Sequence, residues 1–311
     1  MPLTLIDYAA LNKKDLSKIN QALSQQGIIG IRNVPQFEQL SKNFIDAARK
    51  FSRLSEAVKQ HYAPKRDQHD TEGYELGAEK FEDEAGQWWV DDKKASFYAF
   101  VPDRDCNKWP KEVDLKKAYL NLGEIIFHTG KYLLRALGLD EHIGLLHEKI
   151  TGYGRMLHYQ KLDNTTLAQP HWCGAHYDHG IFTGLMPAYY FREGIEIDEP
   201  DEAGLFILPT HGKAFEKMNA ADKSTVLFQV GEFGQLLAND RIRATKHLVK
   251  KAEGGIERYA FALFFNPDDD MIIRPQSVLQ QDARYQSAQS ADGNISYRNW
   301  SRASLENYRA K

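Results

Sequence analysis

The sequence predicts an α+β protein with a β-sandwich or jelly-roll core, a helical N-terminal part and a C-terminal helix. From Arg155 onward, apolar residues repeat with a period of about two, in short segments separated by turn residues. No helical pattern lies between consecutive segments, which disfavours a doubly wound parallel sheet. Two long helical patterns precede these segments, and the tail ISYRNWSRASLENYRA reads as a final helix.

The N-terminal part reads as mixed helix and strand. Apolar periodicity predicts a helix over residues 15–26, a buried strand over 27–34 and a long amphipathic helix over 37–62. Residues 63–112 are rich in charged and aromatic residues and are expected to be irregular. A second long helix is predicted over residues 113–137.

Short β-rich runs make up the predicted core. They read RMLHYQ, GAHYDH, IFTGLM, GLFILP, STVLFQV, GQLLA, IRATKHLV and RYAFALFF. We expect a single domain over residues 1–311. Its N-terminal part spans 1–112, and residues 113–311 hold the central helix, the β core and the C-terminal helix.

Composition and charge exclude several classes of function. The formal net charge is −3 with no run of Lys or Arg, which argues against nucleic-acid binding. The longest apolar runs are too short for a transmembrane helix, so no membrane partner is expected. Two cysteines, and an acidic residue where a signal peptide needs an apolar core, predict a cytoplasmic location. Nothing in the sequence indicates the oligomeric state.

The stretch GAHYDHGIF holds His176 and Asp178 two positions apart. Such pairs occur by chance in a chain with 11 histidines and 43 acidic residues, so unrelated polar residues are an open alternative. In a strand, residues i and i+2 point to the same face and can reach one metal ion. His247, in RIRATKHLVKK, is the best candidate for a third ligand. Two histidines and one carboxylate on one face of a metal are typical of non-haem Fe(II) oxygenases.

Arg258 follows His247 by eleven residues, at the start of RYAFALFFNP. The turn KKAEGG between them predicts a hairpin with the two strands side by side. A guanidinium beside small and aromatic residues needs an anionic partner, because an unpaired buried charge is costly. That partner is either a fixed carboxylate of the protein or the carboxylate of a ligand.

Several segments, taken in their order, resemble the isopenicillin N synthase-like family of Fe(II)/2-oxoglutarate-dependent dioxygenases over nearly the whole chain. They are LIDYAAL, QQGIIGIRNVP, EGYELGAEKF, WWVDDKKASFYAFVP, LHYQ, HYDHGIFTGL, VGEFGQLLANDRIRATKHLV, RYAFALFFNP and the C-terminal helix. The resemblance implies a double-stranded β-helix core. It also implies that His176, Asp178 and His247 bind Fe(II), and that Arg258 binds the distal carboxylate of 2-oxoglutarate with Tyr159 nearby.

The chain departs from the family's pattern in three places. Ala260 replaces the serine of the usual Arg-x-Ser, and Leu157 stands where many plant members have asparagine. Both positions bear on cosubstrate affinity. The segment AYYFREGIEIDEPDEAG lengthens the gap between Asp178 and His247, which predicts an inserted loop. We expect that loop, over residues 186–204, to be mobile and to shape the entrance to the active site.

The function that the resemblance implies is that of an oxidoreductase. Fe(II), 2-oxoglutarate and O2 would be used to hydroxylate a small-molecule substrate, or to cyclise or desaturate it. The alternative is an Fe(II) oxidase of the isopenicillin N synthase type that does not use 2-oxoglutarate; a non-catalytic binding module is a third hypothesis. Tyr74, Trp88 and Trp89 are candidates for the substrate wall, although the two tryptophans could equally close one end of the barrel. Substrate identity is not predictable from fold-level resemblance.

Overall fold

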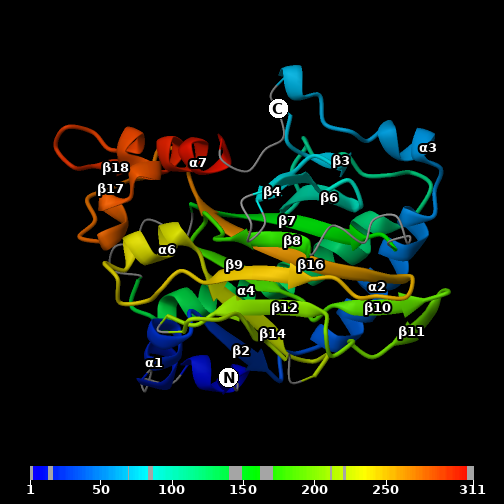
Figure 1. The fold of residues 1–311 in the computed structure, drawn as a ribbon, viewed down its shortest axis with the longest axis horizontal. Coiled ribbons are helices and arrows are strands. Elements are labelled where there is room, and N and C mark those ends of the chain that lie inside the picture. Colours follow the sequence, from blue (N-terminus) through cyan, green and yellow to red (C-terminus); the bar gives the residue numbers. More distant parts are fainter. Residues whose placement is uncertain are drawn as a thin grey trace.

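Two β-sheets face each other in the computed structural model of the protein, and helices cover one of them (Figure 1). The structure describes residues 3–12, 17–68, 70–82, 87–139, 149–161, 171–210, 212–219 and 222–306. Side chains from both sheets line one shared cavity between them. This arrangement confirms the predicted α+β class with a jelly-roll core.

The larger sheet has ten strands. Eight of them follow the order β1 (Leu5–Asp7), β2 (Ile28–Arg32), β14 (Val226–Val230), β9 (Phe182–Leu185), β16 (Ile256–Pro267), β7 (Ile150–Tyr159), β6 (Lys94–Val101) and β3 (Gly73–Leu76). The other two form a hairpin of β10 (Tyr189–Arg192) and β11 (Ile195–Ile197), in which β10 also pairs with β16. The long strand β16 therefore contacts three neighbours.

The smaller sheet has four strands in the order β13 (Glu216–Lys217), β12 (Gly204–Leu208), β15 (Lys246–Lys250) and β8 (His171–His176). Two further strand pairs lie outside the main sheets. They are β4 (Lys80–Glu82) with β5 (Trp88–Val90), and β17 (Ile272–Ile273) with β18 (Ile295–Ser296).

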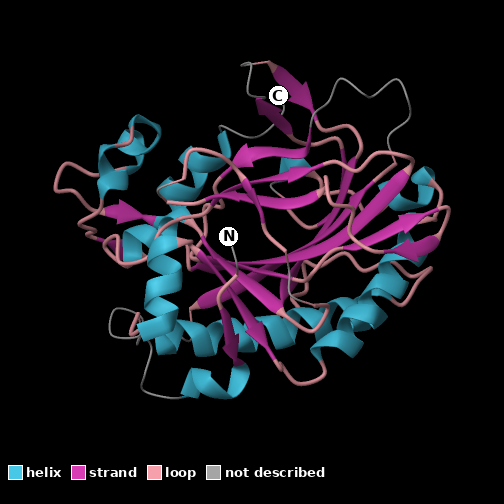
Figure 2. Ribbon diagram, turned by 60° about the horizontal axis from the view of Figure 1, so that its bottom comes forward, coloured by secondary structure: helices cyan, strands magenta, loops and turns pink. Residues whose placement is uncertain are grey.

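Helices lie along the outer face of the larger sheet (Figure 2). The two long ones are α2 (Phe37–Ser52) and α4 (Leu115–Ala136), and α1 (Ser17–Gln25) packs beside β2. Their apolar stripes face inward because i, i+3 and i+4 positions share one side of a helix. Phe44 of α2 and Tyr119 of α4 both meet Phe261 of β16 edge to face, with ring centroids 5.0 and 4.9 Å apart.

The described residues also form shorter helices. They are α3 (Glu56–Gln60), α6 (Glu232–Leu237), α7 (Tyr297–Glu306) and the 3-10 helices η1 (Tyr8–Asn12), η2 (Arg66–Gln68), η3 (Val278–Gln281) and η4 (Ala283–Ala288). The C-terminal helix is thus where the sequence predicts it, although residues 307–311 lie outside the described part of the chain. Within that part, each helix is too short or too polar to span a lipid bilayer.

Three predicted elements were wrong. The helix expected over 37–62 breaks into α2 and α3, because Ser55 caps α3 by accepting a hydrogen bond from the backbone N–H of Val58 at 3.4 Å. Residues 63–112 are not irregular but contain β3, β4, β5 and β6. The run GQLLA is helix α6 rather than a strand, since a short apolar run fits either structure.

Candidate metal centre

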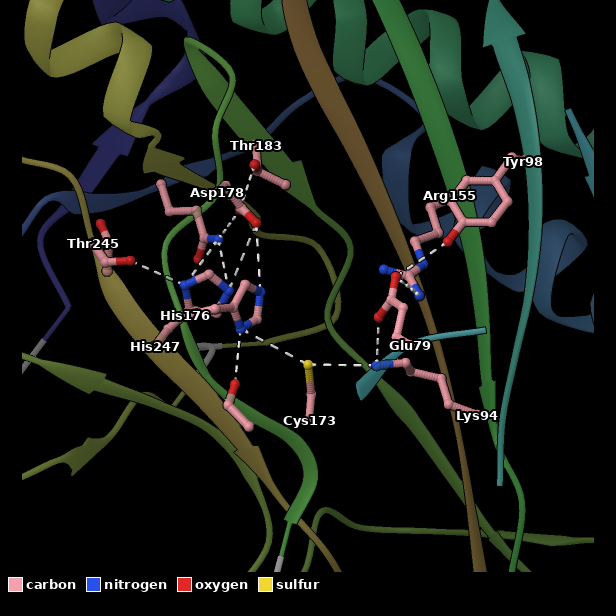
Figure 3. A network of polar contacts seen from close by, with 12 residues as sticks. Glu79, Lys94, Tyr98, Arg155, Cys173, His176, Asp178, Thr183, Thr245 and His247 are labelled. Carbon is pink, nitrogen blue, oxygen red and sulfur yellow. Dashed lines mark hydrogen bonds and ion pairs between the residues drawn. The ribbon is translucent and has the colours of Figure 1, made fainter. Parts of the chain in front are cut away.

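His176 and His247 come from adjacent antiparallel strands of the smaller sheet. They are direct partners in the register of β8 with β15, and their ring centroids lie 4.2 Å apart. Side chains of directly paired residues project from the same face of a sheet. Both rings therefore enter the cavity between the two sheets (Figure 3).

Asp178 does not lie in the same strand as His176, because β8 ends at His176; the expectation that the pair shares one strand face was wrong. Its position is fixed by the larger sheet instead. Asp178 Oδ2 accepts hydrogen bonds from Thr183 Oγ1 at 2.6 Å and from Gln229 Nε2 (Figure 3). Oδ1 is left facing the histidines, 3.6 Å from Nε2 of His176 and 3.9 Å from Nε2 of His247.

The three side chains fit a divalent metal ion. One ligand atom from each lies within 4.8 Å of the others. His176 Nδ1 faces the carbonyl oxygen of Gly174 at 2.8 Å, and His247 Nδ1 faces that of Thr245 at 3.0 Å. A carbonyl only accepts, so the neutral rings carry their protons on Nδ1 and present the Nε2 lone pairs inward. Two imidazoles and one carboxylate suit Fe(II) among other transition metals.

Protonation at the cluster follows from burial and charge. Burial lowers the pKa of His247 to about 4, so this ring is neutral near pH 7. Burial would raise the pKa of Asp178, but the two histidines hold it well below its usual range. Burial would lower the pKa of His176, but Cys173 and Asp178 raise it instead. A metal ion at His176 would therefore have to compete with a proton.

An inner cavity of about 100 Å³ leads from these residues to Arg258. In the register of β16 with β7, Arg258 pairs with Tyr159 and Ala260 with Leu157. All four side chains line the inner cavity, because alternate residues of a strand point to the same face. The structure thus brings Tyr159, Arg258 and Ala260 together beside the candidate metal centre, as the sequence predicts; their binding roles stay predictions.

Arg258 is buried, with 7% of its surface exposed. Its Nε donates to the hydroxyl of Tyr190 at 3.2 Å, and its guanidinium lies 5.0 Å from the ring centroid of Tyr159. The nearby acid Glu199 bonds to Tyr190 and Lys217 instead. Of the two partners that the sequence left open, no carboxylate in the described part of the chain pairs directly with Arg258, which favours a ligand.

An outer cavity of about 960 Å³ opens on the other side of the cluster. Aromatic side chains contribute much of its wall, among them Trp88, Tyr98, Phe100 and Tyr153. The two cavities share the residues Arg155, Cys173, His176, Asp178 and Phe264. The candidate metal centre therefore stands where an inner and an outer chamber meet.

A buried charged cluster lies beside this junction (Figure 3). Lys94 Nζ contacts Glu79 Oε2 at 2.8 Å and Asp91 Oδ2 at 2.5 Å, and it lies 3.6 Å from Cys173 Sγ. Cys173 Sγ is in turn 3.8 Å from Nδ1 of His176. The cluster thus connects the residues that flank β4 and β5 with β8, the strand that carries His176.

The predicted substrate residues lie in three different environments. Trp88 is 51% exposed and lines the outer cavity. Trp89 is half-buried and lines neither cavity. Tyr74 is 1% exposed in the hydrophobic core, where its hydroxyl donates to Glu56 Oε2 at 3.1 Å, and it lines neither cavity.

Sequence reasoning missed several residues of the site. They are Lys94, Arg155, Thr183, Tyr190, Glu199 and Gln229. Strand alternation offered a signal for two of them. Arg155 shares the inward face of its strand with Leu157 and Tyr159, and Gln229 is the polar residue in the otherwise apolar VLFQV.

No family model matches the chain. A curated relative, jasmonate-induced oxygenase 1 of Arabidopsis thaliana, is 25% identical over 296 residues, which cover 88% of this chain and 66% of the relative. The chain thus spans just under two thirds of that protein's length. Among solved structures, a full-length Neurospora crassa protein in complex with alpha-KG (2-oxoglutarate) aligns with a TM-score of 0.72 and 20% identity, covering 98% of this chain and 96% of the fungal one. The chain has the fold of the 2-oxoglutarate- and Fe(II)-dependent oxygenases.

A further structure with this oxygenase fold is JOX2 in complex with 2OG, Fe and JA. It aligns with a TM-score of 0.69 and 19% identity, and the alignment covers 96% of this chain and 83% of JOX2. The predicted resemblance is therefore confirmed at the level of the fold. At these identities the oxygenase fold says nothing of the substrate.

Proposed function

We propose that the protein is a non-haem Fe(II)- and 2-oxoglutarate-dependent dioxygenase that oxidises a small organic molecule. One observation carries this proposal. Three ligand atoms of His176, Asp178 and His247 converge at the junction of two cavities. The inner cavity is also lined by the buried Arg258, which has no acid partner of its own among the described residues. A five-carbon diacid needs both features, because one end of it chelates the metal and the carboxylate at the other end pairs with an arginine.

Each part of the chain has a distinct task in this reaction. The two histidines and Asp178 would hold Fe(II), which couples the oxidative decarboxylation of 2-oxoglutarate to the oxidation of a substrate C–H bond by O2. Arg258 would bind the distal carboxylate through a guanidinium–carboxylate pair. Leu157, Ala260 and other apolar residues of the inner cavity keep water away from the cosubstrate. No protein acid or base has to act.

The comparisons support this assignment. The curated relative is an oxygenase, the Neurospora crassa protein was solved with 2-oxoglutarate, and JOX2 was solved with both 2-oxoglutarate and iron. Hydroxylation, cyclisation and desaturation are all outcomes of this chemistry. We expect the reaction to take place in the cytoplasm, as the composition suggests.

The outer cavity is the proposed substrate site. Both cavities are bordered by Arg155 and Phe264, in addition to Cys173 and two of the candidate metal ligands. Arg155 Nε donates to Ser96 Oγ at 3.0 Å and Nη2 contacts Glu79 Oε1 at 2.9 Å, while Nη1 has no such partner among the described residues. We therefore infer a substrate whose apolar part packs on Phe264 and whose oxygen atom accepts a hydrogen bond from Arg155.

The alternative oxidase, which needs no 2-oxoglutarate, is favoured by one observation. Ala260 lacks the serine hydroxyl that helps to bind the cosubstrate carboxylate in the resembled family, so Arg258 could instead hold the carboxylate of the substrate. The separate inner cavity argues for the first proposal, because it provides a chamber apart from the larger substrate site.

Anaerobic titration of the Fe(II) protein with 2-oxoglutarate distinguishes the two functions. We expect a metal-to-ligand charge-transfer band on titration, and succinate when air is admitted. The oxidase would be established instead by two results together. Millimolar 2-oxoglutarate would give neither the band nor succinate, and oxygen uptake would need the organic substrate but no keto acid.

A further inference from the structure

The hairpin of β10 and β11 lies where the sequence predicts an inserted loop at the entrance. Instead, β10 pairs with β16, and Tyr190 stands directly opposite Arg258 in that register. We propose that Tyr190, held by Glu199, is a positioning residue for Arg258, and that the oriented guanidinium compensates for the hydroxyl that Ala260 lacks. This inference rests on the proposed function, since it concerns the binding of the 2-oxoglutarate carboxylate.

A chain of polar contacts leads from the protein surface to the arginine. Lys217 Nζ contacts Glu199 Oε1 at 3.2 Å, and Glu199 Oε2 accepts the hydroxyl proton of Tyr190 at 3.0 Å. The hydroxyl oxygen of Tyr190 then accepts from Arg258 Nε at 3.2 Å. Tyr190 is fully buried, so no water competes for this bond.

The direction of these bonds matters for the ligand. A phenol has one proton, and Glu199 as a carboxylate only accepts, so the lone pairs of Tyr190 are left for the arginine. Once Nε is occupied, Nη1 and Nη2 of Arg258 stay available for a bidentate contact with a carboxylate. Holding the guanidinium in one orientation before the ligand arrives reduces the loss of side-chain entropy on binding.

The adjacent tyrosine provides a matched control. Tyr189 lies on the same strand, is as deeply buried and belongs to the core cluster on the opposite side of the sheet. Its hydroxyl makes no hydrogen bond in the described part of the chain. Tyr189→Phe therefore removes an equivalent atom from the same strand without touching the Arg258 network.

The test is the dissociation constant of 2-oxoglutarate for Tyr190→Phe, measured by anaerobic titration of the Fe(II) protein. We expect it to rise by up to roughly tenfold, because a guanidinium that is no longer held must lose side-chain freedom when the ligand binds. In turnover the KM for 2-oxoglutarate should rise with little change in kcat. Iron affinity and melting temperature should match those of Tyr189→Phe.

A second variant tests the compensation. Ala260→Ser returns the hydroxyl on β16, so in the Tyr190→Phe background it should recover most of the lost 2-oxoglutarate affinity. Unchanged affinity in Tyr190→Phe, or an equal loss in Tyr189→Phe, would overturn the proposal. A wild-type protein that gives no charge-transfer band would instead overturn the proposed function, so the two failures are distinguishable.

Discussion

His176 and His247 face each other as direct partners across β8 and β15, with ring centroids 4.2 Å apart. One strand register thus sets the position of both imidazoles, although the residues are far apart in the sequence. The register shifts after His247, and a shift of one residue before it would turn the ring to the opposite face of the sheet. The pair is therefore as rigid as the sheet that carries it.

Replacing His247 with alanine should abolish tight iron binding. The variant keeps one imidazole and one carboxylate and so loses one of three protein ligands. The lost ring is also the one that burial keeps neutral, which is the state that binds a metal ion. The measurement is iron content after anaerobic loading and desalting. His179→Ala, which removes a nearby histidine outside the cluster, is the control. Stoichiometric iron in the His247 variant would show that this residue is not a ligand.

Gln229→Leu should weaken iron binding about 10–100-fold, the usual effect of losing a partner that orients a metal ligand. The amide of Gln229 donates to Asp178 Oδ2, which leaves Oδ1 facing both imidazoles. Without it, the carboxylate is held by Thr183 alone and can rotate. Competition with a chelator gives the affinity. Thr225→Val, a change in a buried threonine outside the cavity, should have no effect on it.

How much of the site was predictable depends on the range of the interactions that build it. The two-residue repeat after Arg155 predicts the β core, because alternation is a local signal. That Tyr159 lies near Arg258 is implied by the family resemblance and not by the repeat, which leaves His158 and Tyr159 equally able to face the cavity. The position of Asp178 beyond the end of β8 was not predictable, since it depends on hydrogen bonds from β9 and β14.

The prediction that residues 63–112 are irregular was wrong because it relied on their charged residues. Lys94 is the first residue of the buried strand β6. Its charge can be buried because it pairs with Glu79, which precedes β4, and with Asp91, which follows β5. A lysine near several acids in sequence normally indicates a solvated loop. Only the folded arrangement reveals that these charges are paired with each other and removed from water.

Lys94→Met should therefore destabilise the protein by about 3–5 kcal/mol, the usual cost of removing one partner of a buried ion pair. Lys94 is 5% exposed and Asp91 2%, so Asp91 would lose its nearest positive charge without gaining solvent. Denaturant unfolding measures the change. Adding Asp91→Asn to Lys94→Met should restore part of the stability, whereas equal loss in the single and double variants would show that the ion pair is unimportant.

Amide hydrogen exchange tests whether residues 186–204 are mobile. We expect slow exchange for the β10 amides that pair with β16, both with and without 2-oxoglutarate, because these hydrogen bonds lie within the larger sheet. The mobile entrance loop that the sequence predicts requires fast exchange that slows when the cosubstrate binds. Uniformly fast exchange along β10 would contradict the hairpin and favour that loop.

Arg258→Ala should weaken 2-oxoglutarate binding by orders of magnitude and leave iron binding nearly unchanged. The guanidinium lines the inner cavity from the sheet opposite the strands that carry the two histidines, so its loss does not disturb the metal ligands. Removing one partner of a buried guanidinium–carboxylate pair costs about 3–5 kcal/mol, which corresponds to a weakening of more than a hundredfold.

Arg258→Lys distinguishes the effect of charge from that of geometry. Lysine keeps the positive charge but has no planar fork, and it cannot hold both a carboxylate and the hydroxyl of Tyr190 as the guanidinium does. We expect 2-oxoglutarate affinity between those of wild type and Arg258→Ala, measured by the charge-transfer band of the Fe(II) protein. If Arg258→Ala binds 2-oxoglutarate as wild type does, the anion site lies elsewhere in the cavity. A loss of iron in the same variant would show that Arg258 supports the metal centre rather than the cosubstrate.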